Sequence, residues 1–480
     1  ANRMPTDEDS RYERVPIPEE SARDRVGSFV EIRHPYQPDE AVIEAQRCLQ
    51  CAMPYCVQAC PIAQDCREYI LAVATRDFDR AAVVTLTENS LATTLCKTCY
   101  HYCEDACIMH ERGGAIAIRQ LKRAAMELGK SDLEYVASAP VHQRVAIVGA
   151  GPAGLHAAWE LGLRGYSVTV FEKEPQIGGQ VGAIPKYHMD GWELEVDVAR
   201  FKRLDVTFRM GQKLGRDFTL DSLRSDGYRA IYLALGTPGH NSLGVPGEEL
   251  PGVFPAIDLL EETNVGPPAA LGHRVVVIGG GDVAMDAVRS ALRLTGGGDV
   301  VVVYRRKREQ MSAGAEEISE AEEEGVRFLF ERGPLRVVGS GKVEGVVVQQ
   351  MTLSPPGPSG RPAVVPVPGT EETLPCDSVI VAVGEKADLS GLPKELDLAF
   401  GGQGWPMGKG DDTMTGVEGI FASGGKSVVH AMAAGTKSAN GIDVYLQRQG
   451  GKPPIPRPDP FGRGTLPGLP KGYGGPTWKP

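Results

Sequence analysis

The sequence of 480 residues predicts an α/β fold, in which an α-helical N-terminal region precedes two domains built on parallel sheets. A strand, a glycine turn, a helix and a second strand can be read at residues 144–172, and the same order returns at residues 274–304. Segments within residues 36–137 instead place apolar residues at spacings of three and four, which is typical of helices. A chain of this length exceeds a single hydrophobic core, so several domains are expected.

The composition limits the classes of partner. The formal net charge of −11 argues against binding to nucleic acid, whose phosphates favour a basic surface. No run of about 18 or more apolar residues occurs, so no transmembrane helix is expected. The first residues, ANRMPTDEDSRYERVP, contain no apolar signal core. We therefore expect a cytoplasmic protein with no membrane span and no nucleic-acid partner.

The cysteines form two groups with regular spacing. The first group is Cys48-x2-Cys51-x4-Cys56-x3-Cys60-Pro61, and the second is Cys96-x2-Cys99-x3-Cys103-x3-Cys107. A disulfide scaffold is not expected, because such scaffolds occur in short secreted chains. Zinc sites usually consist of two CxxC pairs, whereas a fourth thiol before proline is typical of two-cluster ferredoxins. The spacing therefore predicts two 4Fe–4S clusters, with zinc or unliganded thiols as the alternatives.

The ferredoxin pattern also predicts how the thiols are shared between the clusters. The first cluster would be held by three thiols, those of Cys48, Cys51 and Cys56. The second would be held by four, those of Cys60, Cys99, Cys103 and Cys107. Cys96 is a candidate fourth ligand for the first cluster. Lys122 is excluded as a ligand because an ammonium group has no lone pair to donate. Cys66 and Cys376 are predicted to be buried packing residues.

The first glycine turn predicts a dinucleotide site. Gly149, Gly151 and Gly154 follow the apolar strand VAIV and open an apolar helix. Glu172 ends the next strand, where a carboxylate should meet a ribose hydroxyl. The glycines allow a pyrophosphate to approach the positive N-terminal end of the helix. A glycine turn alone is a weak signal, but this context makes dinucleotide binding the favoured reading.

The second glycine turn differs at the end of its second strand. The motif is Gly279-Gly280-Gly281-x-x-Ala284, and the strand after its helix ends in YRRKR, beginning at Tyr304. An acidic residue there would repel a 2′-phosphate, whereas arginines can bind it with paired donors. This site therefore favours NADP over NAD, although the basic run could also be a solvated strand end. A flavin can accept two electrons and release them singly, so FAD at the first turn would connect NADP to the clusters.

The chain resembles the family of the small (β) subunit of glutamate synthase. The same module occurs in the N-terminal half of dihydropyrimidine dehydrogenase and in the large subunit of NADH-dependent ferredoxin–NADP oxidoreductase. The motifs that carry the resemblance are RCLQCAMPYCVQACP, VAIVGAGPAGLHAAWEL, VFEKEPQIGGQ, YLALGT, VIGGGDVAMDAVRSALR, YRRKREQMSA, EAEEEGV, VIVAVG and GIFASGG. It implies a helical iron–sulfur domain followed by two interleaved Rossmann-like domains.

The resemblance, with the patterns above, predicts the following domains and cofactor contacts. The expected domains are an arm (1–35), a helical iron–sulfur domain (36–140), a discontinuous FAD domain (141–270 and 377–449), an NAD(P) domain (271–376) and a Pro/Gly-rich tail (450–480), the tail being a candidate partner-wrapping strap. The residues expected to bind FAD or its surroundings are Gly149, Ala150, Gly151, Pro152, Ala153, Gly154, Glu172, Lys173, Gly179, Gln180, Gly236 and Gly424. Those expected to bind NADP are Gly279, Gly280, Gly281, Asp282, Val283, Arg305, Arg306 and Gly384.

Four features depart from the family pattern. Gly425 stands where the family usually has an acidic residue, and His188 replaces an arginine after the Ile-Pro motif. Cys96 and the tail after residue 450 are additional to the family pattern. These departures leave the flavin contacts and the identity of the partner open.

The favoured function is an electron-transfer flavoprotein subunit that moves electrons between NAD(P)H and a partner through FAD and two clusters. The partner would be a larger catalytic redox subunit or a ferredoxin, in a hetero-oligomer. No residue is predicted to be catalytic, and His101, His110 and His188 are expected to be structural or to lie near a cofactor.

Three alternatives remain open. The chain could couple NAD(P)H to a 2-oxoacid, aldehyde or ferredoxin oxidoreductase instead of glutamate synthase. A free-standing flavin disulfide reductase would need a CxxC pair in the Rossmann-like domains, where Cys376 is alone. A scaffold with decayed nucleotide sites is the third alternative.

Overall fold

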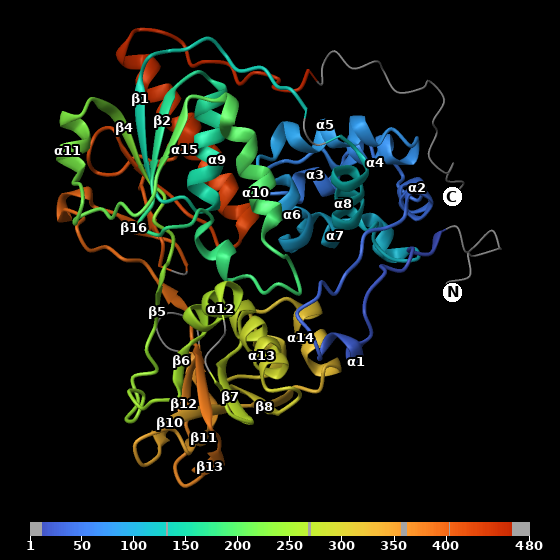
Figure 1. Cartoon of the computed structure of the whole chain (residues 1–480), viewed down its shortest axis with the longest axis vertical. Helices are drawn as coiled ribbons and strands as arrows, with labels where there is room; N and C mark the ends of the chain where they lie inside the picture. The colour runs from blue at the N-terminus through green and yellow to red at the C-terminus, as the bar shows by residue number, and fades with distance from the viewer. Residues whose placement is uncertain (1–11, 131–132, 267–269, 357–361, 403, 463–480) are drawn as a thin grey trace.

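The computed structural model describes residues 12–130, 133–266, 270–356, 362–402 and 404–462. A helical domain lies beside the first sheet domain, and the second sheet domain lies below both in Figure 1. The helices of the helical domain and its arm are α1 (Ala22–Arg25), α2 (Pro38–Gln46), α3 (Tyr55–Ala59), α4 (Cys66–Ala74), α5 (Phe78–Glu88), α6 (Ala92–Thr98), α7 (Tyr102–Asp105), the 3-10 turn η2 (Ile108–Glu111) and α8 (Ile118–Leu128). This agrees with the predicted α-helical N-terminal region.

The first sheet has five parallel strands in the order β18-β4-β1-β2-β3. Its strands are β1 (Arg144–Val148), β2 (Ser167–Phe171), β3 (Val206–Arg209), β4 (Tyr228–Leu233) and β18 (Ile420–Ala422). Side chains on one face of β1 pack with α9 (Pro152–Leu163) and α15 (Val428–Gln449), and those on the other face pack with α11 (Leu220–Ser225). Burial on both faces explains why the strand VAIV is apolar throughout. The short helix α10 (Trp192–Ala199) follows β2 and contacts α6 of the helical domain.

The second sheet is also parallel, in the order β6-β14-β7-β8-β9. Its strands are β6 (Val253–Pro255), β7 (Arg274–Gly279), β8 (Asp299–Tyr304), β9 (Arg327–Phe330) and β14 (Ser378–Ala382). The helices α12 (Ala256–Val265), α13 (Asp282–Leu294) and α14 (Ala315–Glu323) belong to this domain. An antiparallel sheet covers its other side, formed by β10 (Arg332–Val338), β11 (Gly345–Pro356), β12 (Pro362–Pro366) and β13 (Glu372–Pro375).

The strand pairing moves both expected boundaries between the sheet domains. Strands β6 and β14 fall in the ranges 141–270 and 377–449 that were expected to form the first domain, but both pair within the second sheet. The chain crosses between the domains at β5 (Gly239–His240) and β15 (Glu385–Lys386), which pair antiparallel. The sequence could not show this, because an apolar strand such as SVIVA fits either parallel sheet equally well.

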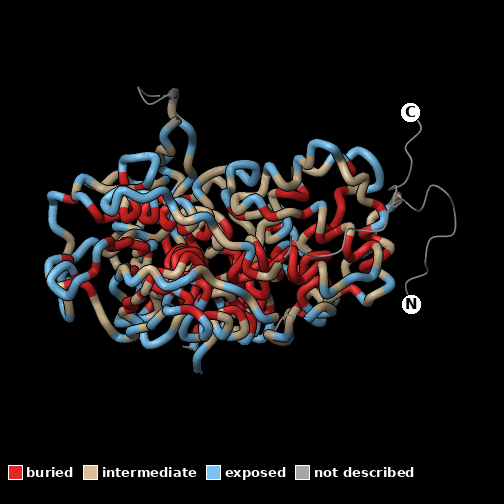
Figure 2. Tube along the Cα trace, turned by 90° about the horizontal axis from the view of Figure 1, so that it is seen from above, coloured by how far each residue is buried: buried red, intermediate tan, exposed pale blue. Residues whose placement is uncertain are grey.

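The helical domain shares a core with the first sheet domain. Leu91 and Leu95 are fully buried in the same cluster as Trp159 of α9. Buried segments accordingly run on from one domain into the other in Figure 2. Within the described part of the chain, no helix has the length and apolarity needed to cross a bilayer.

The arm and the described part of the tail both bind the chain itself. Arg25 of the arm pairs with Glu323 of α14 at 2.5 Å, and Arg33 pairs with Glu316 at 2.9 Å. In the tail, Arg457 pairs with Glu160 of α9 at 2.8 Å and also donates to the backbone of the helical domain. Residues 450–462 therefore act as an intramolecular strap, and residues 463–480 lie outside the described residues.

Candidate functional site

The first glycine turn lets neighbouring backbone segments approach one another closely. Gly149 has φ +112°, and an added Cβ there would overlap the carbonyl oxygen of Ala234. An added Cβ at Gly154 would overlap the carbonyl oxygen of Gly149, because the first turn of α9 packs directly against the strand end. At Gly151 the nearest atom to an added Cβ would be the Cα of Gly179, 4.0 Å away. Only glycine leaves the backbone of this turn both folded and open to a ligand.

Glu172 lies immediately after β2 and faces this turn. Its two carboxylate oxygens accept hydrogen bonds from the backbone N–H of Ala150 (2.8 Å) and of Glu174 (2.9 Å). The side chain is buried, at 6% exposure, yet it lines the cleft described below. These two hydrogen bonds hold the carboxylate in a fixed orientation at the wall of the cleft.

The second glycine turn repeats this construction. Gly279 has φ +155°, and an added Cβ would overlap the carbonyl oxygen of Ala382, while an added Cβ at Gly280 would clash with the ring of Tyr304. Asp282 begins α13 and accepts a hydrogen bond from the N–H of Gly314 at 2.9 Å. Burial raises the pKa of this carboxyl group.

The arginines of the basic run after β8 have different surroundings. Arg305 and Arg306 line the cleft, and within the described residues neither guanidinium has an ion-pair or hydrogen-bond partner. Arg308 instead forms a bidentate pair with Glu322 at 3.0 and 2.8 Å. The first two arginines therefore remain available to an anionic ligand.

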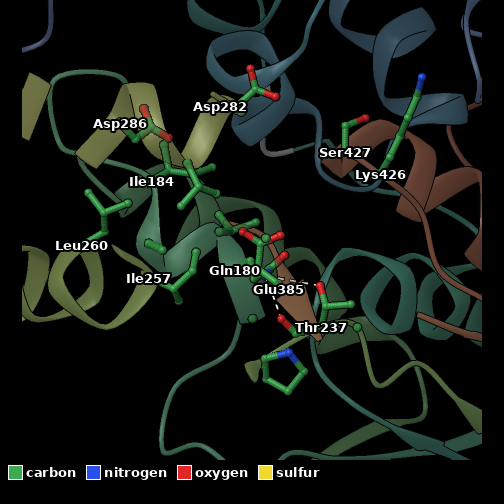
Figure 3. Close-up of a pocket in the computed structure, with 18 of the residues that line it drawn as sticks. Gln180, Ile184, Thr237, Ile257, Leu260, Asp282, Asp286, Glu385, Lys426 and Ser427 are labelled. Atoms are coloured by element: carbon green, nitrogen blue, oxygen red, sulfur yellow. Dashed lines mark hydrogen bonds between the residues drawn. The ribbon is translucent and has the colours of Figure 1, made fainter. Parts of the chain in front are cut away.

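Both glycine turns line one cleft of about 2010 Å³. Every predicted cofactor-binding residue except Ala150 and Gly154 lines it, including Lys173, Gln180, Gly236, Val283, Gly384 and Gly424. Figure 3 shows part of this wall, where Gln180 donates to the carbonyl oxygen of Thr237 at 3.0 Å. Sequence reasoning missed several further lining residues. Thr237 and Asp286 lie within motifs quoted above but were not singled out, and Ile257, Leu260, Glu385 and Ser427 belong to no motif.

Gly425, the departure at the last glycine turn, has a structural reason. An added Cβ there would overlap backbone atoms of His430 and Ala431 at the start of α15. The neighbouring Gly424 faces the indole ring of Trp405, which would lie 2.8 Å from an added Cβ. The turn packs closely against the start of α15, so an acidic side chain at residue 425 would not fit.

The outer thiol group consists of Cys48, Cys51, Cys56 and Cys107. These four cysteines line one small pocket, walled by Ile70, Met109 and Ile116 among other apolar side chains. This corrects the expected sharing, in which Cys107 was assigned to the second cluster. Four soft thiol donors converging on one apolar pocket fit a 4Fe–4S cluster.

The inner thiol group consists of Cys60, Cys99 and Cys103. Cys103 is an electrostatic neighbour of both other thiols, and Lys122 of α8 is a neighbour of all three. Burial raises the pKa of Cys60 to about 11. Cys96 is also close to Lys122, but it packs among Ala82, Leu86, Ala92 and Met126.

Cys66 lies between the two thiol groups. It is buried, and its thiol lies close to Cys56 of the outer group and to Cys103 of the inner group. The hydrogen bond from Cys66 lowers the pKa of the Cys56 thiol to about 7. Sequence reasoning predicted only a packing role for Cys66, whereas Cys376 does sit fully buried in the core of the second sheet domain.

The inner group borders the cleft. Cys99, Tyr100, His101 and Tyr102 all line it. The ring of Tyr102 lies 5.0 Å from that of His430 at the start of α15, close to the last glycine turn. The inner thiols are therefore the ones that face the dinucleotide sites.

His188 ties the first sheet domain to the second. Its Nε2 lies 3.2 Å from Asp286 of α13 and 3.4 Å from Glu317 of α14. Burial alone would lower the pKa of His188, but the two carboxylates raise it to about 9. The ligand atoms of these three residues lie within 4.8 Å of one another, but Arg289 also binds Glu317, at 2.6 Å, so cations already balance the charge without a metal ion. His101 lines the cleft beside Glu316, and His110 is exposed.

Comparison with known proteins agrees with this geometry. A family model described as pyridine nucleotide-disulphide oxidoreductase matches residues 143–439. The chain belongs to the pyridine nucleotide-disulphide oxidoreductase family. A second model, described as dihydropyrimidine dehydrogenase domain II, 4Fe-4S cluster, matches residues 25–132. The predicted classes of cofactor, namely FAD, a pyridine nucleotide and 4Fe–4S, are thereby confirmed for this oxidoreductase.

Relatives of this family member cover most of its length. It is 34% identical over 451 residues to the glutamate synthase [NADPH] small chain of Halomonas elongata, which covers 88% of this chain and 95% of the relative. It is 36% identical over 429 residues to the NADP(+)-dependent formate dehydrogenase subunit beta of Moorella thermoacetica, covering 82% of this chain but only 60% of that protein. The resemblance to glutamate synthase small subunits is confirmed.

A solved structure supports the fold of this family member. Mycobacterium tuberculosis FprA in complex with NADPH aligns with a TM-score of 0.55 at 22% identity, covering 65% of this chain and 86% of that one. At this identity the match shows the fold alone, and it confirms the predicted α/β architecture with Rossmann-like domains.

Proposed function

We propose that the chain is an electron-transfer subunit that takes electrons from NADPH and delivers them, through FAD and two 4Fe–4S clusters, to a larger redox subunit or a ferredoxin. The observation that carries this proposal is the shared cleft, which both glycine turns and the loop from Cys99 to Tyr102 line together. A bound flavin would supply the conversion from a two-electron hydride to single electrons. Relatives named as subunits of glutamate synthase and of formate dehydrogenase support a partner-dependent role.

In this proposal each region has one task. The turn from Gly149 to Gly154, with Glu172, binds FAD, and the turn from Gly279 to Val283 binds NADPH. Arg305 and Arg306 bind the 2′-phosphate, because their guanidinium groups are free and face the cleft. The hydrogen-bonded pair Gln180–Thr237 fixes the wall between the two sites.

The order of the two thiol groups sets the direction of the path. The inner group borders the cleft, and the outer group lies near the surface of the helical domain. Exposed apolar side chains surround the outer group, with Met53 at 59%, Tyr55 at 46% and Ile108 at 45% exposure. An apolar patch around a cluster suits a transient contact with a redox partner.

The test uses the full chain, purified without oxygen and loaded with flavin, iron and sulfide. We expect NADPH to bleach the flavin absorbance and to support dye reduction, with no turnover of glutamine or 2-oxoglutarate. In a Cys48→Ser variant, NADPH should still bleach the flavin, but electron delivery to a ferredoxin should fall strongly. Absence of dye reduction in flavin-loaded protein would refute the proposal.

A further inference from the structure

Lys122 is a buried cation without a carboxylate partner. The residue is 7% exposed and lies on α8, in the interior of the helical domain. Within the described residues, no ion pair or hydrogen bond to its ammonium group is found. Other buried cations of the chain are paired, for example Arg47 with Glu44 at 2.7 Å and Lys97 with Glu193 at 2.5 Å.

The strongest electrostatic neighbours of Lys122 are thiols. They are Cys99, Cys96, Cys103 and Cys60. A buried ammonium among neutral thiols would lack compensation, and an unpaired buried charge is strongly unfavourable. A cluster held by thiolates carries the negative charge that this lysine requires. The residues present therefore fit an anionic iron–sulfur cluster, and they place one fixed positive charge against it.

Cys96 stands apart from the other three thiols. Its strongest electrostatic neighbours are Lys122, Asp197, Glu127 and Arg123. Cys103, by contrast, is a neighbour of both Cys60 and Cys99. Lys122 is a neighbour of Cys96 and of the inner three thiols, so it lies close to both.

We propose that Lys122, and not a fourth cysteine, closes the open side of the inner cluster, and that its charge favours the reduced state of that cluster. Cys60, Cys99 and Cys103 are the thiolate ligands. Reduction adds one electron and hence one negative charge to the cluster, and the nearby ammonium stabilises that charge without any proton moving. The inference rests on the proposed function only in requiring that the inner thiols hold a cluster. Lys122 would act on the reduction potential of that cluster and would not be one of its ligands.

The experiment compares Lys122→Met, Lys122→Gln and Cys96→Ala in full-length, cluster-loaded protein. Methionine has a similar length and no charge, so it suits a buried site. Redox titration followed by electron paramagnetic resonance measures the potential of each cluster, and iron and sulfide assays measure occupancy. We expect both lysine variants to lower the reduction equilibrium constant of one cluster at least tenfold, which is about 59 mV for one electron, with the other cluster shifted less. Cys96→Ala should keep the iron content and both potentials.

Three results would overturn the inference. One is a reduction equilibrium in Lys122→Met and Lys122→Gln within about threefold of the wild-type value. Another is loss of inner-cluster iron from Cys96→Ala, which would make Cys96 a ligand. The third is loss of that iron from both lysine variants, which would make Lys122 a ligand. NADPH-dependent dye reduction by the wild-type protein is measured separately, so a failure of the proposed function is distinguishable from a failure of this inference.

Discussion

The free guanidinium groups of Arg305 and Arg306 make the coenzyme preference directly testable. Both line the cleft at the end of β8 and have no partner in the described part of the chain. A hydrogen bond to a charged group contributes about 1.5–3 kcal/mol. Replacing Arg306 by alanine should therefore lower kcat/KM for NADPH by about 10- to 100-fold. The value for NADH should change little, because NADH carries no 2′-phosphate.

Arg308 provides a matched control from the same basic run. Its bidentate pair with Glu322 is exposed, at 42% and 40% side-chain exposure, and such surface pairs contribute about 0–1 kcal/mol. Steady-state assays with both coenzymes should show an unchanged preference for NADPH in Arg308→Ala. Equal losses with NADPH and NADH in Arg306→Ala and Arg305→Ala would refute the phosphate role, as would a wild-type protein that uses NADH as well as NADPH.

Three further predictions concern the contacts between and within domains. Because the pKa of His188 is raised from its ordinary 6.5 to about 9, its ion pairs with Asp286 and Glu317 should stabilise the fold fully below about pH 6.5 and weaken as the pH rises through 9. His188→Gln should flatten the decline in Tm over that range. Cys66→Ala should lower the equilibrium constant for reduction of the outer cluster about three- to tenfold, since the interaction of its thiol with the Cys56 sulfur is lost, with iron content unchanged. Arg457→Ala leaves Glu160 buried with one cation fewer and should lower the free energy of unfolding by about 2–4 kcal/mol in a denaturant titration.

The glycine turns could be predicted because their chemistry is local. A glycine with positive φ, the strand before it and the helix after it are neighbours in sequence, so Gly149 and Gly279 could be found without a structure. Arg305 and Arg306 follow the same rule, since they end the next strand. Ile257 and Leu260 of α12 could not be found in this way, because they belong to no motif and only the fold brings their segment to the cleft.

The sharing of the thiols shows where spacing stops being informative. Cys103 and Cys107 are separated by four residues, and in a continuous helix they would lie on one face. Helix α7 ends at Asp105, however, and Cys107 has an extended backbone with φ −75° and ψ 123°. The chain therefore leaves the face of Cys103 and carries Cys107 to the outer group. The end of a one-turn helix is not specified by the cysteine pattern, so the ferredoxin analogy assigned the wrong partner.

The loop after Cys99 explains why the helical domain is held against both sheet domains. Tyr100 lies close to Asp282 at the start of α13, and Tyr102 packs on His430 at the start of α15. Between them, His101 adopts a left-handed backbone with φ +42°, which turns the two tyrosines toward different domains. The N-terminal ends of two helices, each beginning near a glycine turn, thus meet Tyr100 and Tyr102, two residues of the same short loop beside the inner thiol Cys99. Any movement of one sheet domain against the other must either break one of these contacts or move the loop that carries both tyrosines. The position of the inner group is therefore linked to the relative position of the two dinucleotide sites.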